Sequence, residues 1–396
     1  MDDIENRLME KVDSIADDLR SLAIRIHDNP ELSLEEYEAC RLHTEMLIEH
    51  GFDVEIGVAG YDTSFIASHK SEKDGPVVAF LAEYDALPGL GHGCGHNLVG
   101  TIATGSAISV MDVIDRFGGE VRVYGTPAEE TVGSKVDFIR EGLFDDCDII
   151  MMAHPSYHNA DGMNTIAMMN MKVEFFGKAA HAAAVPEEGI NALDAMISLY
   201  NMINAYRQQT RPDVRIHGII TNGGDAPNII PAYTSAMFYI RANDREHCNE
   251  VYERMKGIVA AAAMGTGCRH KISQVENFLD DTMTNYALAD IITNRLESFG
   301  VDVKRTKGEH LSVSSDLGNV SHIKPSVQML FSIGTPDSGN MTEAHSIGFA
   351  RDSCSDFALD SMLTYIRAFA LATYDILREP KLLTEIKEEF KRNSSS

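Results

Sequence analysis

The chain has 396 residues, of which 44% are hydrophobic and 24% are charged. That length provides material for two to three domains of about 100–200 residues each. Lys and Arg number 34 against 60 Asp and Glu, a net charge of −26, so the chain lacks the cationic face that nucleic-acid binding requires. Its apolar stretches are shorter than the ~20 residues of a membrane span. The composition therefore excludes nucleic acid and membrane as expected partners.

The cysteines do not form the pattern of a disulfide framework, because six of them are scattered over a long chain. The start of the sequence is acidic and amphipathic and shows no secretory signal peptide. We therefore expect a soluble, reduced protein located in the cytoplasm.

The first part of the chain alternates helical and strand patterns. Apolar residues spaced by threes and fours predict a helix from Ile4 to Ile26, which ends before Pro30. Ser33 followed by Glu36 has the spacing of a capping box and predicts the start of a second helix. Apolar strands and helical segments then alternate at 76–82, 98–115, 121–126, 136–143 and 148–153. This alternation predicts a mainly parallel sheet with helices on both faces, whose active site lies at the carboxyl ends of the strands.

The pattern changes after about residue 167. Strands are expected at 168–177, 214–221 and 233–242, and helices at 189–208 and 244–265, an arrangement typical of an α+β module. Helix, strand and helix then return at 283–299, 326–333 and 354–377. The sequence thus predicts an α/β catalytic domain formed by 1–167 and 280–396, interrupted by an α+β domain inserted at 168–279.

The most informative motif is AEYDALPGLGHGCGHNLVG at 82–100. His92, Cys94 and His96 alternate, so in an extended loop they project to one side. Imidazole and thiolate ligands together suit zinc and similar divalent ions. Asp85 follows the expected strand and is placed to bind a metal or to orient an imidazole. A glycine-rich turn with incidental histidines is the alternative, which the density of ligands disfavours.

Further metal-type residues follow the other strands. Glu129 and Glu130 come directly after the strand at 121–126, where neighbouring side chains point in different directions. One carboxylate is then free to bind a metal while the other accepts a proton from water, as metal-assisted hydrolysis requires. His154 ends an apolar strand, and His345 follows a later one. Each of these signals is weak alone, since a Glu-Glu pair is usually a surface turn.

The inserted domain carries three further candidates. His181 lies among small residues in GKAAHAAAV, which permit close approach to a substrate or another surface. Asn228 lies in a turn-rich segment, and Arg241 lies near the end of the next strand. An asparagine and an arginine together are suited to bind a substrate carboxylate.

Taken together, CGH at 94–96, PAEE at 127–130, His154, GKAAHAA at 177–183 and His345 resemble the aminoacylase–carboxypeptidase family of dinuclear metallohydrolases. The resemblance is to the branch with a cysteine ligand, which includes aminobenzoyl-glutamate and indole-acetyl-amino-acid hydrolases. It implies an inserted lid that also forms a homodimer contact, with His181 often reaching a neighbouring subunit's site. It also implies two divalent ions, zinc first and manganese next. The implied roles are metal ligation by Cys94, His96, Glu130, His154 and His345, catalysis by Glu129 and His181, and substrate binding by Asn228 and Arg241.

The predicted function is metal-dependent hydrolysis of the amide bond in an N-acyl-amino acid or dipeptide. Hydrolysis of longer peptides by the same site is an alternative that the sequence leaves open. A cysteine hydrolase with Cys94 as nucleophile is a second alternative, and a non-catalytic binding protein on the same fold is a third. The complete set of candidate ligands disfavours the last two.

Overall fold

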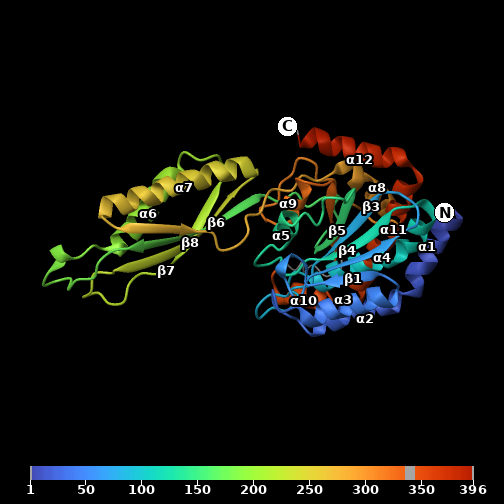
Figure 1. Cartoon of the computed structure of the whole chain (residues 1–396), viewed down its shortest axis with the longest axis horizontal. Coiled ribbons are helices and arrows are strands. Elements are labelled where there is room, and N and C mark those ends of the chain that lie inside the picture. Colours follow the sequence, from blue (N-terminus) through green and yellow to red (C-terminus); the bar gives the residue numbers. More distant parts are fainter. Residues whose placement is uncertain (1, 335–343, 395–396) are drawn as a thin grey trace. The chain divides into compact units, whose positions relative to one another are not determined.

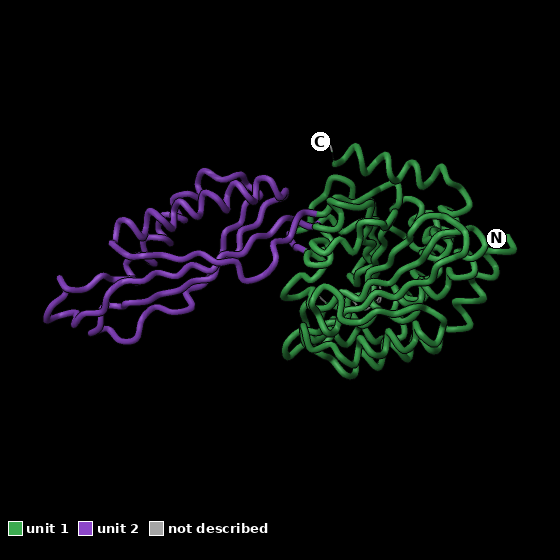
Figure 2. Tube along the Cα trace, viewed as in Figure 1, with its two compact units in different colours: residues 1–164, 282–311, 315–396 green, residues 165–281, 312–314 purple. Residues whose placement is uncertain are grey.

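The computed structural model describes residues 2–334 and 344–394 of the chain. These residues form two compact units, coloured separately in Figure 2. Unit 1 comprises Met1–Asn164, Thr282–Leu311 and Ser315–Ser396, and unit 2 comprises Thr165–Asp281 and Ser312–Ser314. The sequence pattern places the inserted segment at 168–279, inside the longer segment of unit 2.

Unit 1 is built on a six-stranded sheet in the order β1-β2-β4-β3-β5-β10 (Figure 1). The strands are β1 (Asp53–Ile56), β2 (Phe65–Lys70), β3 (Val77–Ala82), β4 (Glu120–Gly125), β5 (Ile149–Ser156) and β10 (Ser326–Ser332). β3, β4, β5 and β10 pair in parallel, which confirms the predicted parallel sheet. β1 and β2 add an antiparallel edge. The sequence pattern misses both edge strands, of which β1 is short and mostly exposed.

Helices of unit 1 come from both ends of the chain. They are α1 (Asp3–Ser14), α2 (Ala16–Asp28), α3 (Tyr37–Glu49), α4 (His96–Phe117), α5 (Lys135–Arg140), α8 (Tyr286–Ser298), α9 (Leu317–Ser321), α10 (Ile347–Asp352), α11 (Asp356–Arg378) and α12 (Pro380–Asn393). A 3-10 turn, η1, covers Val58–Gly60. The helix expected from Ile4 to Ile26 is two helices, α1 and α2, because the backbone leaves the helical region at Ile15.

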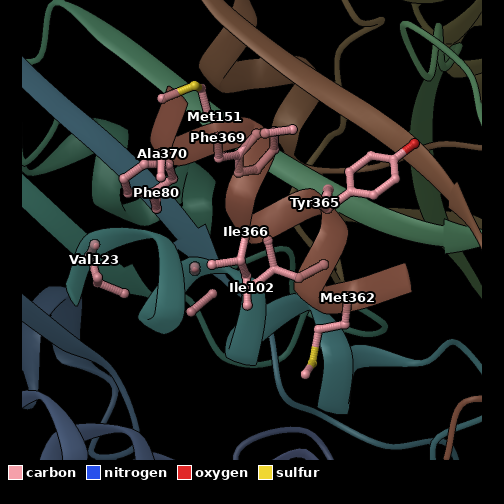
Figure 3. Close-up of a cluster of buried hydrophobic side chains, with 14 of the residues drawn as sticks. Phe80, Ile102, Val123, Met151, Met362, Tyr365, Ile366, Phe369 and Ala370 are labelled. Atoms are coloured by element: carbon pink, nitrogen blue, oxygen red, sulfur yellow. The ribbon is translucent and has the colours of Figure 1, made fainter. Parts of the chain in front are cut away.

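The sheet is covered on both faces, as alternate residues of β3 show. Phe80 packs into the larger hydrophobic cluster, where its ring centroid lies 5.9 Å from that of Phe369 on α11 (Figure 3). Leu81 points the other way, into a cluster with Phe138 of α5 and Leu317 of α9. Full burial of each such side chain is worth about 1.5–3 kcal/mol. Packing on both faces therefore fixes the strands whose ends carry the site.

The predicted capping box at Ser33 and Glu36 is wrong. Helix α3 begins at Tyr37, and Glu36 makes no side-chain capping bond. Ser33 Oγ instead donates a hydrogen bond to Asp85 Oδ2 at 2.9 Å, and the Glu36 carboxylate accepts one from the backbone N–H of Ala128 at 2.8 Å. Both side chains are drawn away from the helix by partners distant in sequence, and both partners lie next to the candidate site.

Helix α4 is the most apolar long helix among the described residues. Its length and composition would allow it to cross a membrane, but 89% of its most apolar window is buried inside the structure. It packs against β3, β4 and β5 and beside α11. These contacts identify α4 as the central core helix of unit 1.

Unit 2 is an antiparallel sheet in the order β7-β8-β6-β9. Its elements are β6 (Ala167–Phe176), η2 (Pro186–Glu188), α6 (Ala192–Arg207), β7 (Arg215–Asn222), β8 (Tyr233–Ala242), α7 (Arg245–Thr266) and β9 (Arg269–Ser273). Alternate residues of β6, such as Met171 and Val173, pack into one cluster with α6 and α7. This is the α+β module that the sequence predicts, with β9 in addition.

The close packing of α4 against α3 and the residue after β3 gives a stability prediction at Gly100. A Cβ added there would lie 2.5 Å from His43 Nε2 and 2.9 Å from the Glu83 carbonyl oxygen. We expect Gly100→Ala to lower the free energy of unfolding by about 1–3 kcal/mol, as overpacking typically does. Gly257→Ala at an exposed position of α7 is the control, because its Cβ meets nothing within 4 Å. If urea unfolding gave the same free energy of unfolding for Gly100→Ala and the wild type, the result would contradict this packing.

Candidate metal centre

Three neighbouring parallel strands deliver polar side chains to one edge of the unit 1 sheet. The loop after β3 leads to Cys94 and to His96, the first residue of α4. The turn after β4 carries Glu129 and Glu130, and β5 carries His154 near its end. Carboxyl ends of parallel strands meet at the same edge, so segments distant in sequence converge there.

The five predicted metal ligands lie together. Cys94 Sγ is 3.4 Å from His154 Nε2, and the rings of His96 and His154 meet edge to face with centroids 5.6 Å apart. Donor atoms of Cys94, His96 and His154 lie within 4.8 Å of one another, as do those of Cys94, Glu130 and His345. Glu130 Oε1 lies 3.3 Å from His345 Nε2. Cys94 therefore joins two overlapping groups of donors.

Two backbone turns with left-handed conformation orient these donors. Gly95 has φ +73°, and a Cβ there would lie 2.7 Å from Pro155 Cγ, so glycine lets α4 start at His96. Ala128 has φ +57°, an unfavourable conformation for a residue with a side chain. Its N–H is held by the Glu36 carboxylate. Burial, with Asp85 nearby, raises the pKa of Glu36 to about 7.

Asp85 orients the donors without belonging to either group. Its Oδ1 lies 2.9 Å from His96 Nδ1, and its Oδ2 accepts a hydrogen bond from the backbone N–H of Glu130 at 3.0 Å. Burial disfavours the charged carboxylate, but hydrogen bonds from His96, Glu130 and Ser33 outweigh it and lower the pKa of Asp85 to about 2. Because the Asp85 carboxylate binds His96 Nδ1, the Nε2 atom of His96 is free to bind a metal, which is the usual arrangement of a metal-binding histidine.

A divalent ion fits this set of residues. His96 Nε2 is buried and has no hydrogen-bond partner among the described residues, although unpaired buried polar atoms are costly. Thiolate, imidazole and carboxylate are together the ligand types of zinc and related ions.

Glu129 differs from its neighbour Glu130. Its side chain makes no hydrogen bond within the described residues, yet one of its oxygens lies within 4.8 Å of donor atoms of His96 and Glu130. Burial and the carboxylates of Glu83 and Glu130 raise the pKa of Glu129 well above its ordinary value. A carboxyl group with a raised pKa beside a metal site is suited to exchange protons.

Sequence analysis missed a buried ion network next to Glu129. Lys135 Nζ donates hydrogen bonds to Glu83 Oε1 and to Asp316 Oδ1, both at 2.6 Å. Burial opposes the charge of Lys135, but Asp316 and Glu83 outweigh it and raise the pKa of this lysine. No spacing in the sequence links these three residues, because they lie on three distant segments.

His92 does not join the donor groups, although it alternates with Cys94 and His96 in sequence. Its Nε2 lies 3.1 Å from the Ile26 carbonyl oxygen, and burial lowers its pKa to about 3. The loop is not extended, because Gly91 and Gly95 turn with positive φ. The expectation that all three side chains project to one side is therefore wrong for His92.

The three candidates of unit 2 lie at two ends of its sheet. His181 pairs with Ile229 in an isolated β-bridge, and the N–H of Ala182 donates to the Asn228 carbonyl oxygen at 3.0 Å. These loops adjoin the end where β8 begins, at Tyr233. Arg241 lies at the other end of β8, where its Nη1 donates to Ser314 Oγ at 2.9 Å.

Comparison with known proteins agrees with this geometry. The family model of a peptidase dimerisation domain matches residues 166–266. Xaa-Arg dipeptidase of Mus musculus is 35% identical to this chain; the match covers 98% of this chain and 92% of the dipeptidase. A p-aminobenzoyl-glutamate hydrolase chain of Escherichia coli is 28% identical over 93% of this chain and 91% of its own length. A dinuclear metal-binding peptidase of the M20 family from Bacillus subtilis shares the fold, with a TM-score of 0.67, 18% identity and coverage of 92% and 99%.

Fold and site together define a metal-dependent hydrolase with an inserted dimerisation domain. The chain belongs to the aminoacylase–carboxypeptidase family of metallohydrolases, the M20 family. It is therefore an enzyme that uses divalent metal ions. Membership excludes the cysteine-hydrolase and non-catalytic alternatives as its main activity.

Asp85 offers a test of how the donors are oriented. Asp85→Asn removes the charge that holds His96 Nδ1, and we expect metal affinity to fall about 10–100-fold, as for similar outer carboxylates. Competition with a chromogenic chelator measures the affinity. Ser33→Ala is the matched control, because it removes only one hydrogen bond to Asp85 and should leave affinity nearly unchanged. Equal affinity of Asp85→Asn and the wild type would refute this role.

Proposed function

We propose that this enzyme hydrolyses the amide bond of dipeptides, with N-acyl-amino acids of the aminobenzoyl-glutamate type as the second substrate class. The observation that carries the proposal is the position of Glu129, within 4.8 Å of the donor group but without a hydrogen bond of its own among the described residues. Dipeptides come first because the dipeptidase relative is 35% identical and the aminobenzoyl-glutamate hydrolase 28%.

The candidate site residues divide into metal ligands, a general base and substrate-binding groups. Cys94, His96, Glu130, His154 and His345 hold the metal ions. When bound, divalent ions in such a site acidify water and polarise the substrate carbonyl. Glu129 takes a proton from the attacking water and returns it to the leaving amine, as a general base and then a general acid. His181 donates a hydrogen bond to the developing oxyanion, and Asn228 and Arg241 bind the substrate.

Zinc is the proposed native ion and manganese the alternative. The Cys94 thiolate is a soft ligand and favours zinc, while the carboxylate and imidazole donors also accept manganese. Metal analysis of protein purified without added ions distinguishes the two.

We propose a homodimer formed through unit 2. The family model that matches this unit describes a dimerisation domain. β7 is an edge strand with exposed apolar side chains, and Ile219 is 65% exposed. Exposed apolar edges of this kind commonly pair with another chain. The compartment we propose is the cytoplasm, because the six cysteines are all free.

The length of β8 bears on how the substrate is bound. Asn228 lies before the first residue of β8, Tyr233, and Arg241 lies near its last, so about 26 Å of strand lies between them at ~3.3 Å per residue. One chain therefore does not bring both side chains to a single small substrate. If both act on one carboxylate-bearing substrate, two copies of the chain must contribute, which favours His181 and Asn228 acting on the partner's site.

A substrate screen tests the proposed function. Purified, metal-loaded enzyme is assayed with dipeptides of varied second residue, with aminobenzoyl-glutamate, and with peptides of four or more residues. We expect dipeptide hydrolysis that is lost on chelation and restored by added metal. Faster cleavage of the longer peptides would favour the alternative peptidase activity, and activity untouched by chelators would refute the metal-dependent mechanism.

Glu129→Gln tests the general base. The amide has nearly the same shape but cannot accept the proton, so we expect kcat to fall at least about 10²-fold. Metal content should stay at the wild-type level, because Glu129 is not among the proposed ligands. Glu130→Gln is the contrasting variant, which should lose metal as well as activity. A fully active Glu129→Gln would remove this residue from the mechanism.

His181→Ala tests whether two chains share a site. The variant should retain metal and dimer assembly but lose turnover, because an oxyanion donor typically contributes about 10²–10³-fold in rate. Mixing it with Glu129→Gln should restore activity to one of the two sites in each mixed dimer if His181 acts across the interface. No recovery despite verified subunit exchange would show that His181 acts within its own chain.

A further inference from the structure

Four charged side chains cluster beside the donor groups, and the proposed reaction uses only Glu129. The other three are Glu83, Lys135 and Asp316, whose side chains have no exposed surface. Lys135 reaches this position from the start of α5 and is held from both sides by carboxylates. The N–H of Lys135 also donates to Asp316 Oδ2 at 3.1 Å, so the lysine is fixed by both its backbone and its side chain.

The carboxylates around this ammonium have the arrangement of a cation site. Oxygens of Glu83, Glu129 and Asp316 lie within 4.8 Å of one another. Glu83 Oε2 is buried but has no hydrogen-bond partner among the described residues, and it lies 3.5 Å from His96 Nε2. An all-oxygen set of this kind suits hard divalent ions such as magnesium and manganese.

We propose that Lys135 is a tethered cation that takes the place of a further divalent ion at Glu83, Glu129 and Asp316. Buried carboxylates need a positive partner, and the lysine supplies one that is covalently attached and cannot coordinate Glu129. A divalent ion in the same position would draw Glu129 into its ligand set. Lys135 thereby leaves Glu129 available for proton transfer, a consequence that rests on the proposed role of Glu129.

Lys135→Ala tests the proposal, because it removes the ammonium group from between the carboxylates of Glu83 and Asp316. We expect the variant, dialysed against manganese, to bind one more ion per chain than the wild type, as measured by mass spectrometry of its metal content. In the cobalt-substituted protein, the extra ion should add d–d absorption without increasing the thiolate-to-cobalt charge-transfer band, because its ligands are all oxygen. The control is the double variant Lys135→Ala/Asp316→Asn, which replaces one carboxylate by a neutral, weaker amide donor and should return to the wild-type metal content.

Stability provides a second readout, because removal of a buried lysine can prevent folding. Lys135→Ser keeps the vacated space and adds a polar group. We expect manganese to raise the Tm of both single variants more than it raises that of the wild type. Folded variants with wild-type metal content would overturn the proposal, and so would variants that stay unfolded at every manganese concentration.

The metal count is independent of the proposed reaction. If Glu129→Gln remained active, the general-base proposal would fail while an extra ion in Lys135→Ala would still support the tethered cation. If Lys135→Ala bound no extra ion, the tethered cation would fail while the kinetics of Glu129→Gln would still decide the role of the base.

Discussion

The Asp85 carboxylate joins its own loop, which leads to His96, to two segments that are distant in sequence. It accepts hydrogen bonds from Ser33 before α3 and from the N–H of Glu130 after β4, and it holds His96 at the start of α4. Asp85 itself follows β3. One buried side chain thus orients both an imidazole and the turn that carries Glu129 and Glu130. Because hydrogen bonds to a buried carboxylate are strong, the whole site depends on this group remaining ionised.

Residues that follow parallel strands are the part of the site that sequence can predict. Cys94, His96, Glu130 and His154 each come after or at the end of an apolar run, and the strand-end rule places them at one edge. The structure brings these four together with His345. Sequence patterns likewise predict the parallel strands, which are continuous apolar runs, and three of the four strands of the insertion; β9 is not predicted.

Supporting residues cannot be predicted in this way, because their partners are distant in sequence. Ser33 and Glu36 have the spacing of a capping box, but their side chains form hydrogen bonds with Asp85 and with the backbone of Ala128 instead. Lys135 lies 52 residues from Glu83 and 181 from Asp316. A lysine that opens a short helix would ordinarily be exposed, and only the fold shows that it is buried.

The same limit applies to unit 2. Asn228 and Arg241 are close in sequence, yet an extended strand carries them to opposite ends of the sheet. Nearness in sequence implies nearness in space within a turn or a helix, but not along a strand.

Metal-edge X-ray absorption most directly tests the central claim that Cys94 and the strand-end donors form one metal centre. The zinc-loaded enzyme should show a sulfur ligand at about 2.3 Å together with nitrogen and oxygen ligands at about 2.0–2.2 Å. In Cys94→Ser the sulfur contribution should disappear. A wild-type spectrum with nitrogen and oxygen ligands alone would contradict this account.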